Sequence, residues 1–356
     1  MAVFLTLRCQ MVTVATLAAP NLFKVKKMTH NELMHLMTET LETGLFELHG
    51  RSVQVQEIER EFSPYSSSFS TERLQVRVDT NEWLYMFFKD LNPQHQLADA
   101  RLLRGADLGR SQCELNMYRY ILSRLSLGTP KLYGYRWEPQ RALLWLFLEY
   151  VDAERLIRTG DFQLWVEAAR WAARFHVAAS DFSTTEIGFL PQHDQSRYAH
   201  CVRRLQNALG EFDAEERLII QHALDHYETS IEHLHSLPYG LIHGEFFGEN
   251  ILVRRKKTVE PIVVIDWETA AIGPIYLDLI SISTGRWTQQ QRLTMWRAYF
   301  EQYQLETGRQ LDWLDFCHDL KSVALYHALT WLGWWSNRNK KHMRDWLKEL
   351  KKVHWD

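Results

Sequence analysis

The sequence contains few cysteines, and they are not arranged as a metal site or a disulfide framework. Cys9, Cys113, Cys201 and Cys317 are scattered over 356 residues, and no two of them have CxxC spacing. Disulfide-stabilised secreted domains are short and cysteine-rich, and zinc-binding sequences carry closely spaced ligand pairs. We therefore expect reduced thiols and a cytoplasmic location.

The sequence also lacks a strong charge of either sign and a long apolar run. Its formal net charge is −3, with 46% hydrophobic and 24% charged residues. No basic face stands out, and we interpret the basic run at 254–257 as a solvated turn. No segment reaches the run of about 18 apolar residues that crosses a bilayer. We expect neither nucleic acid nor a membrane as a partner, and no feature of the sequence specifies an oligomeric state.

The first residues are apolar but differ from a secretion signal. They have no basic segment at their start, and Arg8 interrupts the apolar run. We interpret residues 1–28 as a poorly ordered leader, with Met11 and Met28 as alternative starts. The length and composition of the rest allow a sizeable core in two lobes or domains.

Residues 241–266 combine short apolar runs with oxygen-bearing side chains. One run ends at Val253 and the next fills 262–265, so the polar segment between them predicts a tight hairpin. Such a hairpin brings the loop that holds Glu245 and Asn250 beside Asp266, at the end of the second run. Carboxylate and amide oxygens are the ligands of hard cations. The stretch therefore predicts a site for Mg²⁺ and the phosphates that it carries.

The same residues resemble a known family. The pattern His243-Gly-Glu245, with Asn250 five residues later and Asp266 after the hairpin, is similar to the catalytic loop and metal-binding Asp of the aminoglycoside phosphotransferase and choline kinase-like family. The resemblance extends from about Glu61 to the C-terminus. It implies an α+β, two-lobed protein-kinase-like fold, with a small antiparallel sheet in the N-lobe and a larger, mainly helical C-lobe.

The resemblance also implies roles for these residues. In a kinase catalytic loop an acid accepts the hydroxyl proton, an Asn five residues later holds magnesium, and a second acid bridges the metals. Glu245, Asn250 and Asp266 match these catalytic positions, with Asn250 and Asp266 as Mg²⁺ ligands and ATP or GTP as the phosphate donor. The family's usual base is Asp, so Glu245 is one methylene longer.

Residues 29–150 are expected to form the N-lobe. A capping box at Thr29 predicts a helix that ends at Gly44, and alternating apolar residues then predict strands between 52 and 90. This arrangement, a helix followed by antiparallel strands, agrees with the nucleotide-phosphate side of a kinase.

Polar side chains of this lobe are candidates for binding the nucleotide. Ser67 and Ser68 lie in a hydroxyl-rich turn that the resemblance places over the phosphates, although the turn alone fits an ordinary polar hairpin better. Lys89 closes the third strand and looks like the family's phosphate-binding Lys. The next helix, expected to begin at Ser111, carries Glu114. This residue could pair with Lys89 and align it, complete a capping box, or both.

A buried strand at 142–148 leads into the lobe boundary, which we place near residue 151. By resemblance, the backbone at Glu149 and Val151 reads the purine edge. Residues 151–356 should be mainly helical and hold the catalytic loop and the acceptor site.

The acceptor is expected to be a small molecule with a hydroxyl group, and cationic molecules are among the candidates. Eight of the fourteen Trp residues follow residue 280. They could form an aromatic cage for a cation. Helix packing explains them more simply, because Trp331 and Trp335 are four residues apart on one helix face.

Histidines of this lobe are interpreted as structural. His176 lies beside a helical apolar stripe and is expected in the core. By resemblance, His243 braces the catalytic loop and Asp278 holds its backbone.

The long helix capped by Asp213 should turn Leu218 inward. Four histidines along and near the end of that helix fit a solvated surface better than a metal site: His222, His226, His233 and His235.

Two functions remain after these steps. One is a Mg²⁺-dependent small-molecule kinase that phosphorylates a hydroxyl of an amino-sugar, amino-alcohol or sugar-like acceptor. The other is a pseudokinase or nucleotide-binding module with little transfer, suggested by Glu245 and by the glycine-poor phosphate turn. Retention of Lys89, Asn250 and Asp266 favours the kinase, because a binding module needs fewer of these groups.

Overall fold

The computed structural model describes residues 28–63, 69, 71–98, 107–256 and 258–353. The expected leader lies outside this part of the chain except for Met28, and so do Ser67 and Ser68. Within the described residues, no helix is long and apolar enough to cross a membrane.

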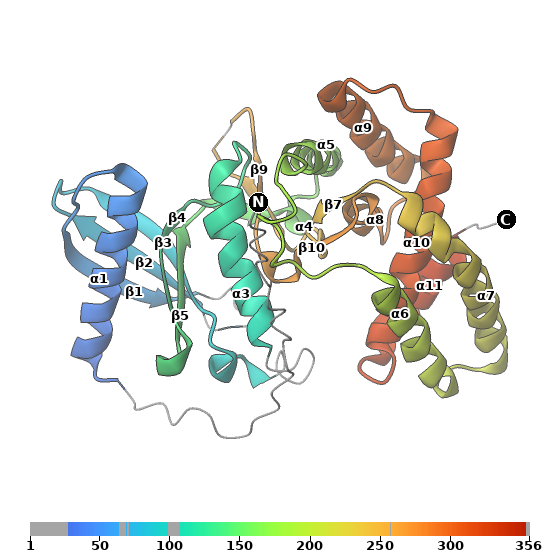
Figure 1. Cartoon of the computed structure of the whole chain (residues 1–356), viewed down its shortest axis with the longest axis horizontal. Helices are drawn as coiled ribbons and strands as arrows, with labels where there is room; N and C mark the ends of the chain where they lie inside the picture. The colour runs from blue at the N-terminus through green and yellow to red at the C-terminus, as the bar shows by residue number, and fades with distance from the viewer. Residues whose placement is uncertain (1–27, 64–68, 70, 99–106, 257, 354–356) are drawn as a thin grey trace, which may run out of the picture.

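A five-stranded antiparallel sheet forms the smaller lobe, with strand order β1-β2-β3-β5-β4 (Figure 1). Its β5 is buried along almost its whole length, whereas β2 alternates between buried and half-buried positions. A strand that is covered on both faces reads as a continuous apolar run. The strands are β1 (Val55–Phe62), β2 (Thr71–Val78), β3 (Trp83–Asp90), β4 (Leu132–Glu138) and β5 (Leu143–Glu149).

Helix α1 (His30–His49) packs on one face of this sheet, where its apolar side chains join a core with β2, β3 and β5. It begins at the predicted capping box of Thr29. The predicted end at Gly44 is wrong, because the helix continues until Gly50 adopts the left-handed conformation of a C-cap. Gly44 serves close packing instead: a Cβ there would lie 2.1 Å from the carbonyl oxygen of Tyr133 in β4.

Helix α3 (Leu108–Asn116) lies between the sheet and the helical lobe (Figure 1). The predicted start at Ser111 is wrong, because Asp107 caps the helix one turn earlier. The Ser111 hydroxyl donates a hydrogen bond of 2.7 Å to the carbonyl of Leu91, just after β3. That bond ties α3 to the end of the strand and holds Glu114 near it.

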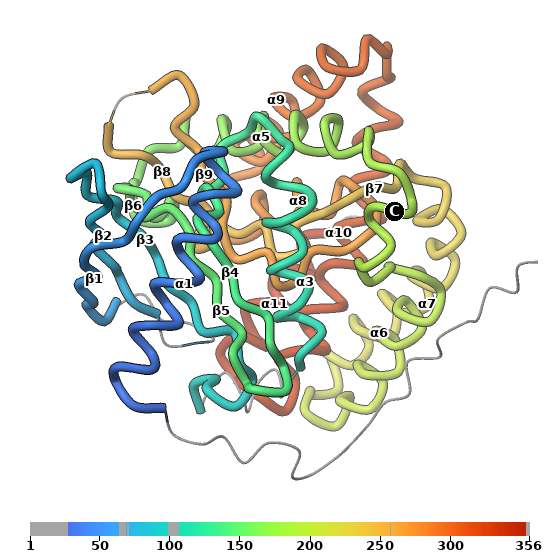
Figure 2. The backbone as a smooth tube through the Cα atoms, turned by 60° about the vertical axis from the view of Figure 1, so that its left-hand side comes forward, coloured from blue at the N-terminus to red at the C-terminus, as the bar shows by residue number. Residues whose placement is uncertain are grey.

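The second lobe is mainly helical, as expected, and also carries two small sheets. The predicted hairpin is confirmed by antiparallel pairing of β8 with β9, while β6 flanks β8, and β7 pairs with β10. Figure 2 shows β6, β8 and β9 at the upper left, apart from α6 and α7 at the lower right. The strands are β6 (Ala153–Arg155), β7 (Tyr239–Ile242), β8 (Ile251–Arg254), β9 (Ile262–Val264) and β10 (Ala271–Pro274). The helices are α4 (Leu156–Thr159), α5 (Phe162–Ala179), α6 (Gln195–Asn207), α7 (Ala214–Ser236), α8 (Tyr276–Ser283), α9 (Gln289–Thr307), α10 (Trp313–Trp335) and α11 (Lys340–Lys352).

Helix α7 begins at the predicted capping box of Asp213 and Glu216. Leu218, expected to point inward, is 73% exposed. The buried face of the helix contains Ile220 and Leu224. Leu218 precedes Ile220 by two residues, about 200° around an α-helix, so it faces the opposite side. This prediction was therefore wrong.

Candidate active site

The loop between β7 and β8 is held by a single buried carboxylate, that of Asp278 in α8. Its two oxygens accept hydrogen bonds from the backbone N–H groups of His243, at 2.7 Å, and Gly244, at 3.0 Å. The same carboxylate lies 3.1 Å from Nε2 of His176, whose Nδ1 is 2.9 Å from the hydroxyl of Tyr299. Asp278 therefore holds the loop backbone, and His176 is a hydrogen-bonded core residue, as predicted.

His243 is fully buried and links the loop to the end of β9. Its Nε2 lies 2.9 Å from the carbonyl oxygen of Ile265, and its Nδ1 lies 3.3 Å from the backbone N–H of Glu245. The carbonyl can only accept and the N–H can only donate, so the ring is the neutral tautomer with its proton on Nε2. His243 therefore braces the loop.

Gly244 adopts a backbone conformation that other residues rarely tolerate. Its φ is +84°, and a Cβ at this position would lie 2.4 Å from the carbonyl oxygen of Thr269. Both observations require glycine, because a side chain would be strained and would collide with backbone.

Asn250 closes the other end of the loop. Its Nδ2 donates a hydrogen bond of 3.0 Å to the carbonyl oxygen of Glu245, and its own carbonyl accepts from the N–H of Ile265 at 3.0 Å. The amide nitrogen thus faces the loop, and the amide oxygen is the atom through which Asn250 can bind a cation. The second bond places Asn250 beside Ile265, the residue directly before Asp266.

Asp266 follows β9 in a left-handed conformation, with φ 68° and ψ 62°. Non-glycine residues in this region cost about 1–3 kcal/mol and persist where surrounding structure enforces them. The Oδ1 atom of Asp266 lies 2.8 Å from Nζ of Lys89 in β3. A strand of one lobe and a strand end of the other thus meet at this point.

Lys89 also pairs with Glu114 of α3, at 2.7 and 3.0 Å from the two carboxylate oxygens. The side chains of Lys89 and Glu114 are only 7% and 2% exposed. Burial lowers the pKa of Lys89, but the charges of Asp266 and Glu114 outweigh it and raise this pKa above the ordinary lysine value. Of the two alternatives left open for Glu114, the ion pair with Lys89 is therefore present, whereas the helix is capped by Asp107 and not by Ser111. Lys89 stays protonated at neutral pH.

The residues fit a divalent cation. The carboxylate of Asp266 already binds one cationic group, the ammonium of Lys89. Asn250, whose amide oxygen is available to a cation, directly precedes β8, the strand that pairs with β9 just before Asp266. Oxygen donors of this kind are those that Mg²⁺ selects.

At the junction after β5, the Glu149 carboxylate accepts a hydrogen bond of 3.3 Å from the backbone N–H of Lys131 and lies 3.5 Å from Arg254 of β8. This side chain therefore ties the sheet to the second lobe. The N–H of Val151 makes no hydrogen bond with the described residues. Recognition of a purine by Glu149 and Val151 stays a prediction.

An aromatic cluster next to the catalytic loop was not assigned to the site from the sequence. Phe247, inside the loop, lies 5.5 Å from the ring of Trp331, and Trp331 stacks on Trp346 at 5.7 Å and 13°. The Trp residues pack on one another, as predicted, but their partner in the loop was missed. Phe247 between Glu245 and Asn250 was the one signal that the sequence offered.

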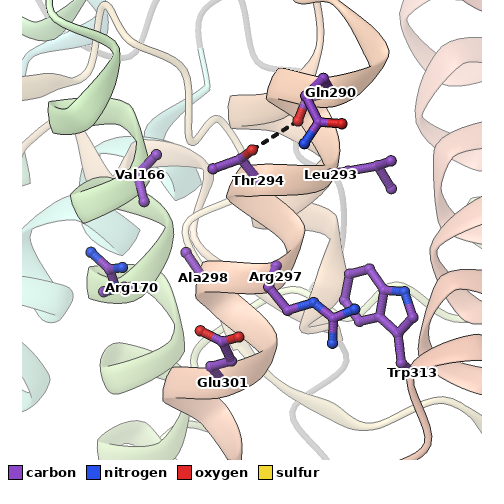
Figure 3. A pocket seen from close by; sticks show the side chains of 9 residues that line it. All are labelled: Val166, Arg170, Gln290, Leu293, Thr294, Arg297, Ala298, Glu301 and Trp313. Atoms are coloured by element: carbon purple, nitrogen blue, oxygen red, sulfur yellow. Dashed lines mark hydrogen bonds between the residues drawn. The ribbon is translucent and has the colours of Figure 1, made fainter.

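A separate groove of about 390 Å³ lies between α5 and α9 (Figure 3). It contains none of the predicted site residues. Arg297 in its wall lies 3.6 Å from the ring centre of Trp313, and Arg170 forms an ion pair with Glu167. Both arginines of the groove are thus engaged with neighbouring side chains.

The sheet-and-helix arrangement and the groups at its junction define a two-lobed, protein-kinase-like protein. Residues 61–314 match the model of the phosphotransferase enzyme family, and the chain belongs to this family. It is therefore a phosphotransferase. Comparison of the sequence with curated proteins finds no match.

Solved structures share the fold at low sequence identity. The microcompartment-associated aminopropanol kinase matches with a TM-score of 0.59 and 16% identity, over 83% of this chain and 90% of that one. Choline kinase from Cryptosporidium parvum gives 0.57 and 15%, over 83% and 90%. The GDP complex of aminoglycoside 2'-phosphotransferase-IIIa gives 0.56 and 13%, over 91% and 98%.

Proposed function

We propose that this phosphotransferase moves the γ-phosphate of ATP or GTP to a hydroxyl group of an amino-sugar, amino-alcohol or sugar-like molecule. The observation that carries the proposal is the buried contact of Lys89 with both Glu114 and Asp266. Phosphoryl transfer requires positioning and charge neutralisation more than covalent chemistry from the protein. An ammonium fixed by two carboxylates beside the catalytic loop meets that requirement.

Each residue has a distinct role in this proposal. Glu114 orients the ammonium of Lys89 toward the α and β phosphates. Glu245 accepts the proton of the acceptor hydroxyl as general base. Asn250 and Asp266 would hold Mg²⁺, which when bound neutralises phosphate charge. The backbone at Val151 contacts the purine.

Lobe division and location belong to the same proposal. We place the boundary near residue 151, which is supported by β5 ending at Glu149 and β6 pairing with β8 of the other lobe. A cytoplasmic location is supported by the free cysteines Cys113, Cys201 and Cys317.

The aromatic cluster suggests where the acceptor binds. Trp331 and Trp346 are half-buried, and Phe247 joins them to the catalytic loop. Aromatic faces attract ammonium groups, so a cationic acceptor fits this wall. We expect Trp331→Leu to raise the KM for the acceptor and to leave the KM for the nucleotide unchanged. A change confined to the nucleotide KM would place the acceptor elsewhere.

The central experiment measures nucleotide consumption with Mg²⁺, using ATP and GTP separately and a panel that contains choline, aminopropanol and aminoglycosides. At least one acceptor should be phosphorylated. Replacement of a general base costs about 10² to 10⁴ in rate, so Glu245→Gln should lower kcat to that extent without changing nucleotide affinity. Nucleotide binding without consumption by any acceptor would support the pseudokinase instead.

A further inference from the structure

Three side chains with metal-binding atoms meet between α7 and α10. His233 lies in the last turn of α7, and His318 and Asp319 lie in the second turn of α10. One ligand atom from each residue lies within 4.8 Å of the others. Figure 1 shows α7 at the end of the molecule away from the five-stranded sheet. In α10, His318 and Asp319 lie more than two turns before His327 and Trp331, the residues that contact Phe247 of the catalytic loop, so the cluster is separate from the catalytic groups.

The contact between His233 and Asp319 is not an ordinary hydrogen bond. Nε2 of His233 lies 3.0 Å from Oδ1 of Asp319. Nevertheless, this nitrogen is shielded from solvent and has no hydrogen-bond partner among the described residues. The distance suits a hydrogen bond but the direction does not. A short distance without hydrogen-bond direction is the arrangement of two atoms whose lone pairs both point toward a third position, where a metal ion can bind.

The same spacing suits two ligands of one metal ion. Zinc binds nitrogen and oxygen at about 2.0–2.2 Å, so two ligands at a tetrahedral angle lie about 3.4 Å apart. The rings of His233 and His318 have centroids 5.2 Å apart at 73°, which brings the second imidazole to the same place without stacking. All three ligand atoms lie within 4.8 Å of one another, so they need to approach by at most about 1.4 Å to reach this spacing.

We propose that His233, His318 and Asp319 bind one Zn²⁺ ion, with water as a fourth ligand. Two imidazoles and one carboxylate are a ligand set typical of zinc, and they disfavour Mg²⁺, which requires oxygen ligands. His318 is exposed, so an ion can enter from solvent. Bound zinc links the end of α7 to α10. This proposal departs from the interpretation of His233 as solvated surface, because its neighbours His318 and Asp319 come from another helix.

The test uses the full chain, freed of metal with a chelator and titrated with ZnCl₂ at neutral pH in the presence of excess Mg²⁺. We expect one zinc ion per chain. Loss of a side chain that only hydrogen-bonds to a metal ligand already reduces metal affinity about 10- to 100-fold. His318→Ala and Asp319→Asn, which change the ligands themselves, should therefore each weaken zinc binding at least about tenfold. Zinc should also raise the Tm of the wild-type protein more than that of either variant.

His222→Ala is the matched control, since it removes an exposed histidine from the same helix, α7. It should bind zinc as the wild-type protein does. Phosphotransfer in zinc-free buffer should be the same for His318→Ala and wild type, which also shows that the variant is folded. Absence of stoichiometric zinc binding by the wild type, or equal affinity of His318→Ala, Asp319→Asn and His222→Ala, would refute the site. Neither result bears on the catalytic proposal.

Discussion

Removing the ammonium of Lys89 should destabilise the protein strongly. Lys→Met keeps the length of the side chain but leaves Glu114, only 2% exposed, without its cation. Breaking a buried ion pair from one side costs about 3–5 kcal/mol, because the remaining charge is neither solvated nor paired. We therefore expect Lys89→Met to lower the free energy of unfolding by about this amount at pH 7.

The pH dependence gives a second check on Lys89. Its pKa is raised in the folded protein, so its stabilising effect is complete below about 10.4, the ordinary lysine pKa, and is lost as pH rises through the folded value. The full deficit of Lys89→Met should therefore appear at neutral pH. At lower pH Glu114, which has lost the ammonium of Lys89, takes up a proton more easily, so the deficit should shrink.

Urea unfolding, followed by tryptophan fluorescence at pH 8, 7 and 5, measures these differences. The matched control is the double variant Lys89→Met/Glu114→Gln, which removes the pair from both sides. It should recover part of the lost stability but no activity, because Glu114 is then neutral while the carboxylate of Asp266 still lacks the ammonium of Lys89. A stability of Lys89→Met within about 1 kcal/mol of wild type, typical of an exposed pair, would refute the reasoning.

Other substitutions test the support of the catalytic loop and core. Gly244→Ala should lower stability by about 1–3 kcal/mol and reduce kcat. The control Gly210→Ala, whose Cβ would lie in open space, should change neither. Equal Tm values for the two variants would contradict the requirement for glycine at position 244. Asp278→Asn should reduce kcat about 10- to 100-fold with unchanged nucleotide affinity, since it weakens charge-assisted bonds to the loop, and a change in affinity alone would oppose this role. Burial lowers the pKa of His327 to about 3. The unfolded chain thus binds a proton below about pH 6.5 that the folded chain does not, and stability should fall by up to about 1.4 kcal/mol per pH unit between these values. Unfolding of His327→Gln at pH 7, 5 and 4 should show a shallower slope, and an unchanged slope would exclude His327 as the cause.

The catalytic loop could be predicted because its signals are local. Glu245, Asn250 and Asp266 lie within one loop and one hairpin, and the turn between two apolar runs dictates which ends meet. The pairing of β8 with β9 follows directly from that pattern. The contact of Lys89 with Glu114 was harder to predict, because the sequence assigned Lys89 to a strand and Glu114 to the following helix but left their contact open.

Features that depend on approach between distant segments could not be predicted. Gly44 resembles a helix stop, yet it lies inside α1 because β4 passes too close for a side chain. Ser111 resembles a cap, yet its hydroxyl is used by Leu91. The neighbour of His233 is not in its own helix, because Asp319, 3.0 Å away, belongs to α10. In each case a tertiary contact outweighs the local preference.

The hydrogen bonds that hold the catalytic loop determine where the longer side chain of Glu245 places its carboxylate. Asp278 holds the two residues before Glu245, and Asn250 holds the carbonyl of Glu245 itself. None of these bonds uses the side chain at position 245, so the backbone there is fixed by its neighbours. Compared with Asp on the same backbone, Glu extends the carboxylate by roughly 1.5 Å. A misplacement of about 1 Å costs about a hundredfold in rate. An acceptor that reacts efficiently must therefore place its hydroxyl correspondingly farther from the loop, and the cluster of Phe247, Trp331 and Trp346 is the wall that can hold it there.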